Sequence, residues 1–158
     1  MEKLSLVLWR ERELLETLQY RLEVEQLVMA NGRSRWLANA ARDVESVLEE
    51  IRGTEILRSV AADEAAEELG LPPNPSLTSL VERVAEPWHS ILADHRAAFR
   101  AASDEIIRLA DANRTLISAG VRAARETLLG LGGEVQTYTP DGTTVVGAAR
   151  SARVDRSL

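Results

Sequence analysis

Only one short motif in the sequence has a spacing that metal chemistry uses. Glu86 and His89 stand three residues apart, the Glu-x-x-His spacing of di-iron helical bundles. A di-iron site needs a second such motif and two more glutamates, but the other histidine, His95, follows Leu92 at that distance. The chain contains no cysteine, which excludes a thiolate metal site and a disulfide framework. We therefore expect no metal and no other cofactor.

A helical histidine can also accept a phosphoryl group, as in phosphotransfer bundles. His95 falls on an apolar stripe, His89 lies beside that stripe, and neither has a lysine neighbour. The glycines at 130, 132 and 133 follow a helix and precede a polar tail, which is the wrong context for a phosphate-binding loop. We expect a protein that is not an enzyme, and a histidine phosphotransfer bundle remains the enzymatic alternative.

Three amphipathic segments must position any functional residue. The first, about residues 4–30, carries a heptad-like seam interrupted by Glu11 and Glu25, and Asn31-Gly32 should end it. The second should begin at Ser34 as its N-cap and end at Gly70. Its stripe includes these residues: Leu37, Ala40, Val44, Val47, Leu48, Ile51, and, beyond Gly53, Ile56, Leu57 and Val60.

The third segment is the longest. Asn74 should cap it with Pro75 in its first turn, and apolar residues recur from Leu77 to Leu128 at a spacing near 3.5. Pro87 should kink or break it. We predict an all-α fold: an elongated antiparallel three-helix bundle or coiled coil over 1–131, with a long third helix. Residues 132–158 should form a flexible tail, in which 135–146 could make a hairpin.

Composition narrows the function further. The chain has 158 residues, 45% hydrophobic but only 4% aromatic, as in aliphatic helical bundles. A net charge of −6 argues against nucleic acid as a partner. No run approaches the roughly 20 apolar residues of a membrane span, and the N-terminus lacks the basic start of a secretory signal. We expect a cytoplasmic protein with no membrane insertion.

A third helix much longer than the other two leaves part of its stripe without a partner. That surplus predicts a binding surface, a dimer surface, or both. Asn113 lies within the stripe, where it could set the register of the bundle or meet the backbone of a partner. Gly120 and Ala124 open space for close helix approach, or for tight packing within the chain.

The sequence resembles the FlgN-type flagellar export chaperones over about residues 4–142. The resemblance is carried by LVLWRERELLETLQYRLEVEQ, by VESVLEEIRGTEILRSVA, and by LADANRTLISAGV leading through TLLGL to YTPDG. It implies a chaperone of flagellar type III secretion that covers the amphipathic terminal helices of the hook–filament junction proteins FlgK and FlgL. It also implies delivery of these clients to the export gate protein FlhA, with the tail tyrosine, here Tyr138, taking part in docking.

Helix-in-groove recognition requires exposed aliphatic anchors on a long helix. We expect the client-binding residues to be Ile106, Leu109, Leu116, Ile117, Val121 and Leu128, with Asn113 as the orienting polar group. Tyr138 is expected to dock at the export gate, although it could instead pack back on the bundle. The main alternative is a structural homodimeric coiled coil in which the third helix pairs with itself. The arginines at 150, 153 and 156 are not explained by the resemblance.

Overall fold

The computed structural model describes residues 1–133, with side-chain environments through Leu131. The elements in chain order are α1 (Glu2–Ala30), the 3₁₀ helix η1 (Ser34–Trp36), α2 (Leu37–Leu69), α3 (Leu77–Arg83) and α4 (Trp88–Gly133). No strand occurs within residues 1–133. The predicted all-α fold is therefore confirmed. Tyr138, the hairpin stretch and the rest of the tail lie outside the described residues.

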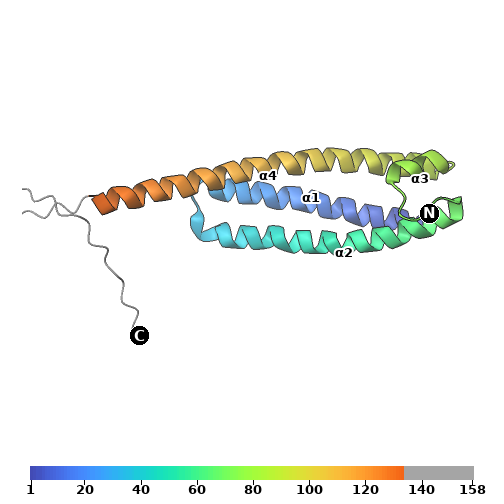
Figure 1. Cartoon of the computed structure of the whole chain (residues 1–158), viewed down its shortest axis with the longest axis horizontal. Coiled ribbons are helices and arrows are strands. Elements are labelled where there is room, and N and C mark those ends of the chain that lie inside the picture. The colour runs from blue at the N-terminus through green and yellow to red at the C-terminus, as the bar shows by residue number, and fades with distance from the viewer. Residues whose placement is uncertain (134–158) are drawn as a thin grey trace, which may run out of the picture. The chain divides into compact units, whose positions relative to one another are not determined.

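The chain divides into two units between Ile117 and Ser118, so the boundary falls within α4. In the first unit, α1, α2 and the first part of α4 lie side by side (Figure 1). Arg10 pairs with Glu50 and Arg21 with Asp43, so α1 and α2 are antiparallel. Trp9 contacts His95 and Leu22 contacts Asn113, so α1 and α4 are parallel. The first unit is thus an up-down-up bundle of three helices.

Two glycines end helices as the sequence predicted. Gly32 and Gly70 both have positive φ, +62° and +64°, a conformation that suits glycine because it has no Cβ. After α1, the Arg33 N–H donates to the Val28 carbonyl and the Gly32 N–H donates to that of Met29. The same pair of bonds follows α2 at Gly70 and Leu71. Both ends are Schellman motifs that satisfy the last free carbonyls.

The predicted helix starts are wrong. Ser34 does not cap α2 but opens the short helix η1, and the N-cap of α2 is Trp36, which makes no side-chain bond. Asn74 has a positive φ of +59° and does not start the next helix. Its place is taken by Ser76, whose hydroxyl accepts a bond from the Ser79 N–H. An N-cap residue usually has an extended backbone, which Ser76 has and Asn74, with its positive φ, does not.

Pro87 breaks the third predicted segment rather than bending it. Helix α3 ends at Arg83 and α4 begins at Trp88. Proline lacks the N–H that helix continuation needs, and its ring crowds the preceding turn. The break leaves α3 as a separate short helix at one end of the bundle (Figure 1), where Leu80, Val81 and Val84 are buried.

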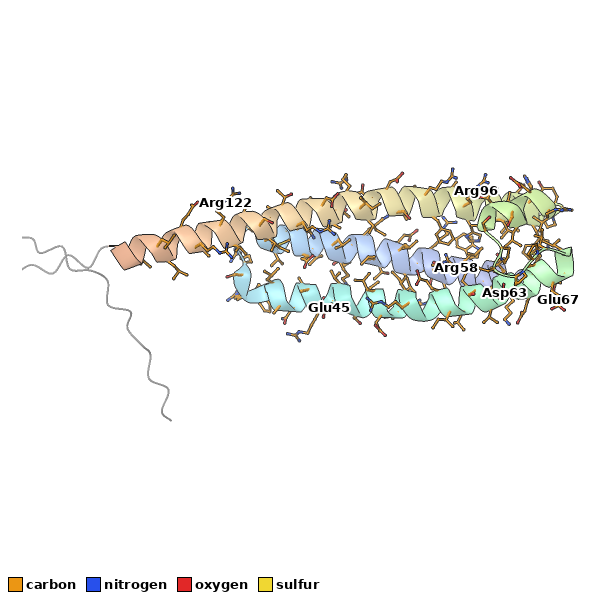
Figure 2. The ribbon with its side chains drawn as sticks, viewed as in Figure 1. Glu45, Arg58, Asp63, Glu67, Arg96 and Arg122 are labelled. Carbon is orange, nitrogen blue, oxygen red and sulfur yellow. The ribbon has the colours of Figure 1, made fainter. Side chains whose placement is uncertain are left out.

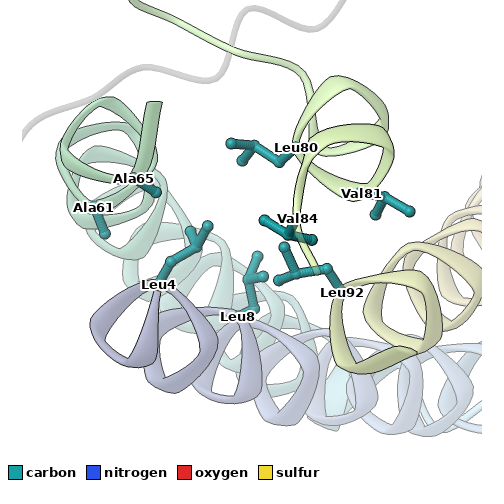
Figure 3. Packing of buried hydrophobic residues seen from close by; sticks show 8 residues of the cluster. All are labelled: Leu4, Leu8, Ala61, Ala65, Leu80, Val81, Val84 and Leu92. Carbon is teal, nitrogen blue, oxygen red and sulfur yellow. The ribbon is translucent and has the colours of Figure 1, made fainter. Parts of the chain in front are cut away.

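The hydrophobic core consists of two clusters. The first joins side chains of all four α-helices, as Figure 3 shows: Leu4, Leu8, Ala61, Ala65, Leu80, Val81, Val84 and Leu92. The second contains Leu14, Leu18, Leu22, Val47, Ile51 and Leu109. Between the clusters, each long helix contributes one buried polar residue: Glu11, Thr54 and His95. We call these three residues the polar layer.

The predicted stripe of α2 is wrong beyond Gly53. Ile56, Leu57 and Val60 are exposed at 67%, 59% and 50%, whereas the alanines 61, 65 and 66 are buried. Small side chains suffice there because Leu80 of α3 fills the space above Ala65 (Figure 3). This contact between distant segments makes the alanines, rather than the larger aliphatic residues, the buried face of the helix.

Candidate functional site

The aliphatic residues of α4 differ in how far they are covered. In the first unit, Leu109 is buried, Ile106 and Leu116 are half-buried, and Ile117 is 46% exposed. In the second unit, every side chain from Ser118 to Leu131 is exposed, including Val121 at 46% and Leu128 at 69%. Leu129 and Leu131, which the sequence reasoning did not name, are exposed at 77% and 70%. The apolar surface of α4 is therefore concentrated near its C-terminal end.

Helix lengths account for this exposure. Helix α4 has 46 residues and α1 has 29, so α4 is longer by 46 − 29 = 17 residues. At 1.5 Å per residue, about 25 Å of α4 exceeds what a parallel partner of that length can cover. Val121 and Leu128, both in the second unit, are spaced by seven residues, close to two turns, which places them on one side of the helix. An aliphatic row at this spacing can receive another amphipathic helix.

Asn113 is occupied within the bundle. It is only 3% exposed, and its Nδ2 donates to the Leu22 carbonyl at 3.0 Å and to Glu25 Oε2 at 2.9 Å. Both acceptors belong to α1, and Glu25 is the second polar residue in the predicted seam of that helix. These bonds hold α4 in one register against α1. Leu109 and Asn113 therefore do not belong to the exposed surface of α4.

His95 sits in an aromatic environment. Its ring makes an edge contact with Trp9, 5.0 Å between centroids, and stacks on Phe99 at 6.2 Å. The Arg12 guanidinium lies 4.6 Å from the centre of the Trp9 ring. Burial lowers the pKa of His95, the positive charge of Arg12 lowers it further, and Asp94 opposes the shift. At 1% exposure, this imidazole is inaccessible to a phosphoryl donor, which weighs against the phosphotransfer alternative at His95.

Glu86 and His89 do come together, 3.5 Å apart between Oε1 and Nδ1, but both side chains are exposed. Glu86 also accepts bonds from the Ser90 hydroxyl and N–H, which hold its pKa below the usual value. Within residues 1–131, no group of three or more histidine, aspartate or glutamate side chains is placed to hold a metal. The two side chains make a solvent-exposed contact at the start of α4.

Glu11 is the charged member of the polar layer. Its carboxylate accepts a bond from Arg58 Nη1 at 2.9 Å, with side-chain exposures of 6% for Glu11 and 41% for Arg58. Burial raises the pKa of Glu11, Arg58 lowers it in part, and the nearby charge of Glu55 raises it. Sequence reasoning placed Glu11 in the seam but did not find Arg58, whose position on α2 is in phase with the buried residues Thr54 and Ala61.

These features define a helical bundle whose longest helix presents aliphatic side chains near its C-terminal end. None of the helices within residues 1–133 is both long and apolar enough to cross a membrane. The sequence model of the family described as FlgN protein matches residues 1–145. The chain belongs to the FlgN family and thus to the flagellar export chaperones, which act in flagellum biogenesis. No curated protein and no solved structure is significantly similar to the chain.

Proposed function

We propose that this chaperone acts in the cytoplasm and binds the amphipathic terminal helices of the hook–filament junction proteins FlgK and FlgL. Binding prevents their premature assembly, and the chaperone then delivers them to the export gate protein FlhA. The observation that carries the proposal is the row of exposed aliphatic side chains on α4, in a chain of the FlgN family. Burying such side chains contributes roughly 25 cal/mol per Å², less the entropy lost when the client helix becomes ordered.

The client-binding residues divide into anchors and supports. Ile117, Val121 and Leu128 are exposed and act as anchors. Ile106 and Leu116 are half-buried and contribute their outer edges. Leu109 and Asn113 are buried against α1 and act only by holding α4 in place. Tyr138 is the proposed gate-docking residue, and the family match to residue 145 includes it.

The test is calorimetric titration of the full chain with the C-terminal helical peptides of FlgK and FlgL from the same organism. We expect saturable micromolar or tighter binding. Val121→Asp combined with Leu128→Asp should weaken it by more than tenfold, because each places a charge in an apolar contact. Leu6→Asp on α1, a position with 65% exposure, is the matched control and should bind normally. No binding to either peptide would contradict the proposal.

Gate docking is tested separately. Tyr138→Ala should leave peptide binding unchanged and weaken pull-down by the cytoplasmic domain of FlhA. Loss of peptide binding in this variant would contradict the division of roles. The alternative of a structural homodimer predicts, instead, a tight dimer by light scattering that Val121→Asp converts to monomer and that does not bind either peptide.

A further inference from the structure

An exposed apolar patch lies on α2, the helix that the proposed client site does not use. Ile56, Leu57 and Val60 are at least half exposed, and they lie on one side of the helix because Val60 follows Ile56 by four residues and Leu57 by three. Gly53 lies one turn before them, and a Cβ at that position would meet no atom within 4 Å. We propose that this patch, residues 53, 56, 57 and 60, is a docking surface for a basic amphipathic helix of a partner protein.

The fold itself does not explain these residues. The opposite side of α2 buries Ile51, Thr54 and Ala61 in the bundle, so the patch must face outward. Polar side chains in its place would leave the core unchanged. Glycine within a helix weakens it relative to alanine, and no packing contact in the bundle requires glycine at residue 53. A small residue beside exposed aliphatic ones lets a second helix approach closely.

The negative charge around the patch indicates a positively charged partner. Glu45 and Glu67 lie eleven residues before and after Ile56, close to three helical turns, and therefore on the same side of α2. Figure 2 shows Glu45, Asp63 and Glu67 along this helix. Neither Glu45 nor Glu67 joins an ion pair with the described side chains. Helix α2 contains nine acidic residues and three arginines, a net −6 that equals the charge of the whole chain.

A hollow at one end of the patch fits a long basic side chain. It is lined by Val60, Leu71 and Pro73 together with the acidic residues Asp63, Glu64 and Glu67. Glu64 pairs with Lys3 and Asp63 accepts a bond from the Asn74 N–H, whereas Glu67 has no ion pair among the described side chains. An arginine or lysine can lay its aliphatic stem on the apolar lining and place its cationic head beside Glu67. This combination of apolar floor and acidic rim favours a basic segment over an uncharged one.

Other occupants are disfavoured by the same charges. In a symmetric pair of α2 patches, the acidic ends of one copy would lie against those of the other, and like charges in an interface are repulsive. An anionic membrane surface is repelled for the same reason. A helix with aliphatic residues at its centre and arginines toward both ends satisfies the apolar patch and the two acidic ends together.

The probe is a synthetic amphipathic helix long enough to reach from Glu45 to Glu67, with leucines at its centre and arginines near both ends. A matched peptide has glutamates in place of the arginines. Binding to the isotopically labelled full chain is followed by NMR. We expect saturable binding of the arginine peptide, shifts of amides in 45–67, weakening at about 0.5 M salt, and no binding of the glutamate peptide.

Variants locate the site. Ile56→Ser combined with Val60→Ser should weaken binding by roughly tenfold or more, because the pair forms the centre of the contact. Glu45→Gln with Glu67→Gln should weaken it and reduce its salt dependence. Leu6→Ser is the control, because Leu6 is 65% exposed and Ile56 is 67% exposed, and it should bind normally. Circular dichroism verifies the fold of each variant.

Four results would overturn the proposal. The first is no saturable binding, and the second is equal binding of the glutamate peptide. The third is a set of amide shifts confined to α4 that the Ile56 and Val60 substitutions leave unchanged. The fourth is self-association of the chain that those substitutions abolish. The last result would make a second copy the occupant.

Discussion

Replacing Arg58 with methionine removes the partner of a buried carboxylate while keeping a long side chain in place. Glu11 and Arg58 are 2.9 Å apart, and the Glu11 side chain is 6% exposed. At an effective dielectric constant near 20, Coulomb attraction at this distance is about 6 kcal/mol. Because 41% of the Arg58 side chain reaches solvent, we halve this value for screening. Arg58→Met should therefore lower the free energy of unfolding by about 3 kcal/mol at pH 7.

The reverse replacement should behave differently. Burial raises the pKa of Glu11 despite Arg58, which means that desolvation outweighs the attraction. Glu11→Leu removes that desolvation and extends the apolar seam, and Arg58 can return to solvent. We expect a free energy of unfolding equal to that of the parent protein or about 1 kcal/mol higher.

Urea unfolding followed by circular dichroism measures both variants, and pH supplies a second check. The pKa of Glu11 is higher in the folded protein than its unfolded value near 4.5. Such a carboxyl group costs no stability below pH 4.5, and its cost grows as pH rises from there through the folded pKa. The difference between parent and Arg58→Met should therefore shrink as pH falls from 7 toward 5. A larger loss for Glu11→Leu than for Arg58→Met, at any pH in this range, would refute the reasoning.

Three further predictions follow from other described residues. Gly53→Ala should raise the free energy of unfolding by about 0.5–1 kcal/mol in a urea titration, since nothing within 4 Å opposes the added methyl group. The pKa of His95 is lowered in the fold, so its contribution is intact above its unfolded value near 6.5 and stability is lost as pH falls below it. His95→Phe should flatten the stability profile between pH 6.5 and 5, and an unchanged slope would contradict this. Asn113→Ala should lower stability by about 1–2 kcal/mol through the two lost hydrogen bonds, measured by thermal unfolding, with Thr115→Ala on the exposed side of α4 as control.

The sequence predicted features that depend on a few neighbouring residues. The glycines at 32 and 70 end helices because the left-handed conformation is a local property, and Pro87 interrupts the third segment because it lacks an N–H. The seam of α1 was also predictable, including Glu11 and Glu25 as its polar positions, except that Leu14 is buried where the spacing pointed to Leu15. Both glutamates have partners on other helices: Arg58 bonds to Glu11 and Asn113 to Glu25. Of these two partners, only Asn113 was recognised from the sequence.

The parts that failed depend on contacts between distant segments. Following hydrophobicity along α2 leads from Ile51 to Ile56, whereas following the helical phase leads through Thr54 and Arg58 to Ala61. The second path is the buried one, but α3 must supply the bulk that the alanines lack, and no local pattern reveals that packing. The sequence also could not tell which apolar residues of α4 are buried and which are exposed. Their burial depends on where the neighbouring helices end, which is again a contact between distant segments.

The polar layer divides the buried apolar residues of the bundle into two clusters. The buried apolar side chains of the two clusters form separate groups, and Glu11, Thr54 and His95 lie between them along the helices. Effects of substitutions couple when residues share neighbours and add when they do not. A cavity made at Leu8 and one made at Leu18 should therefore lower stability additively, whereas cavities at Leu4 and Leu80 should interact. A substitution in one cluster should therefore need no compensating substitution in the other, so the two ends of the bundle can change in sequence independently.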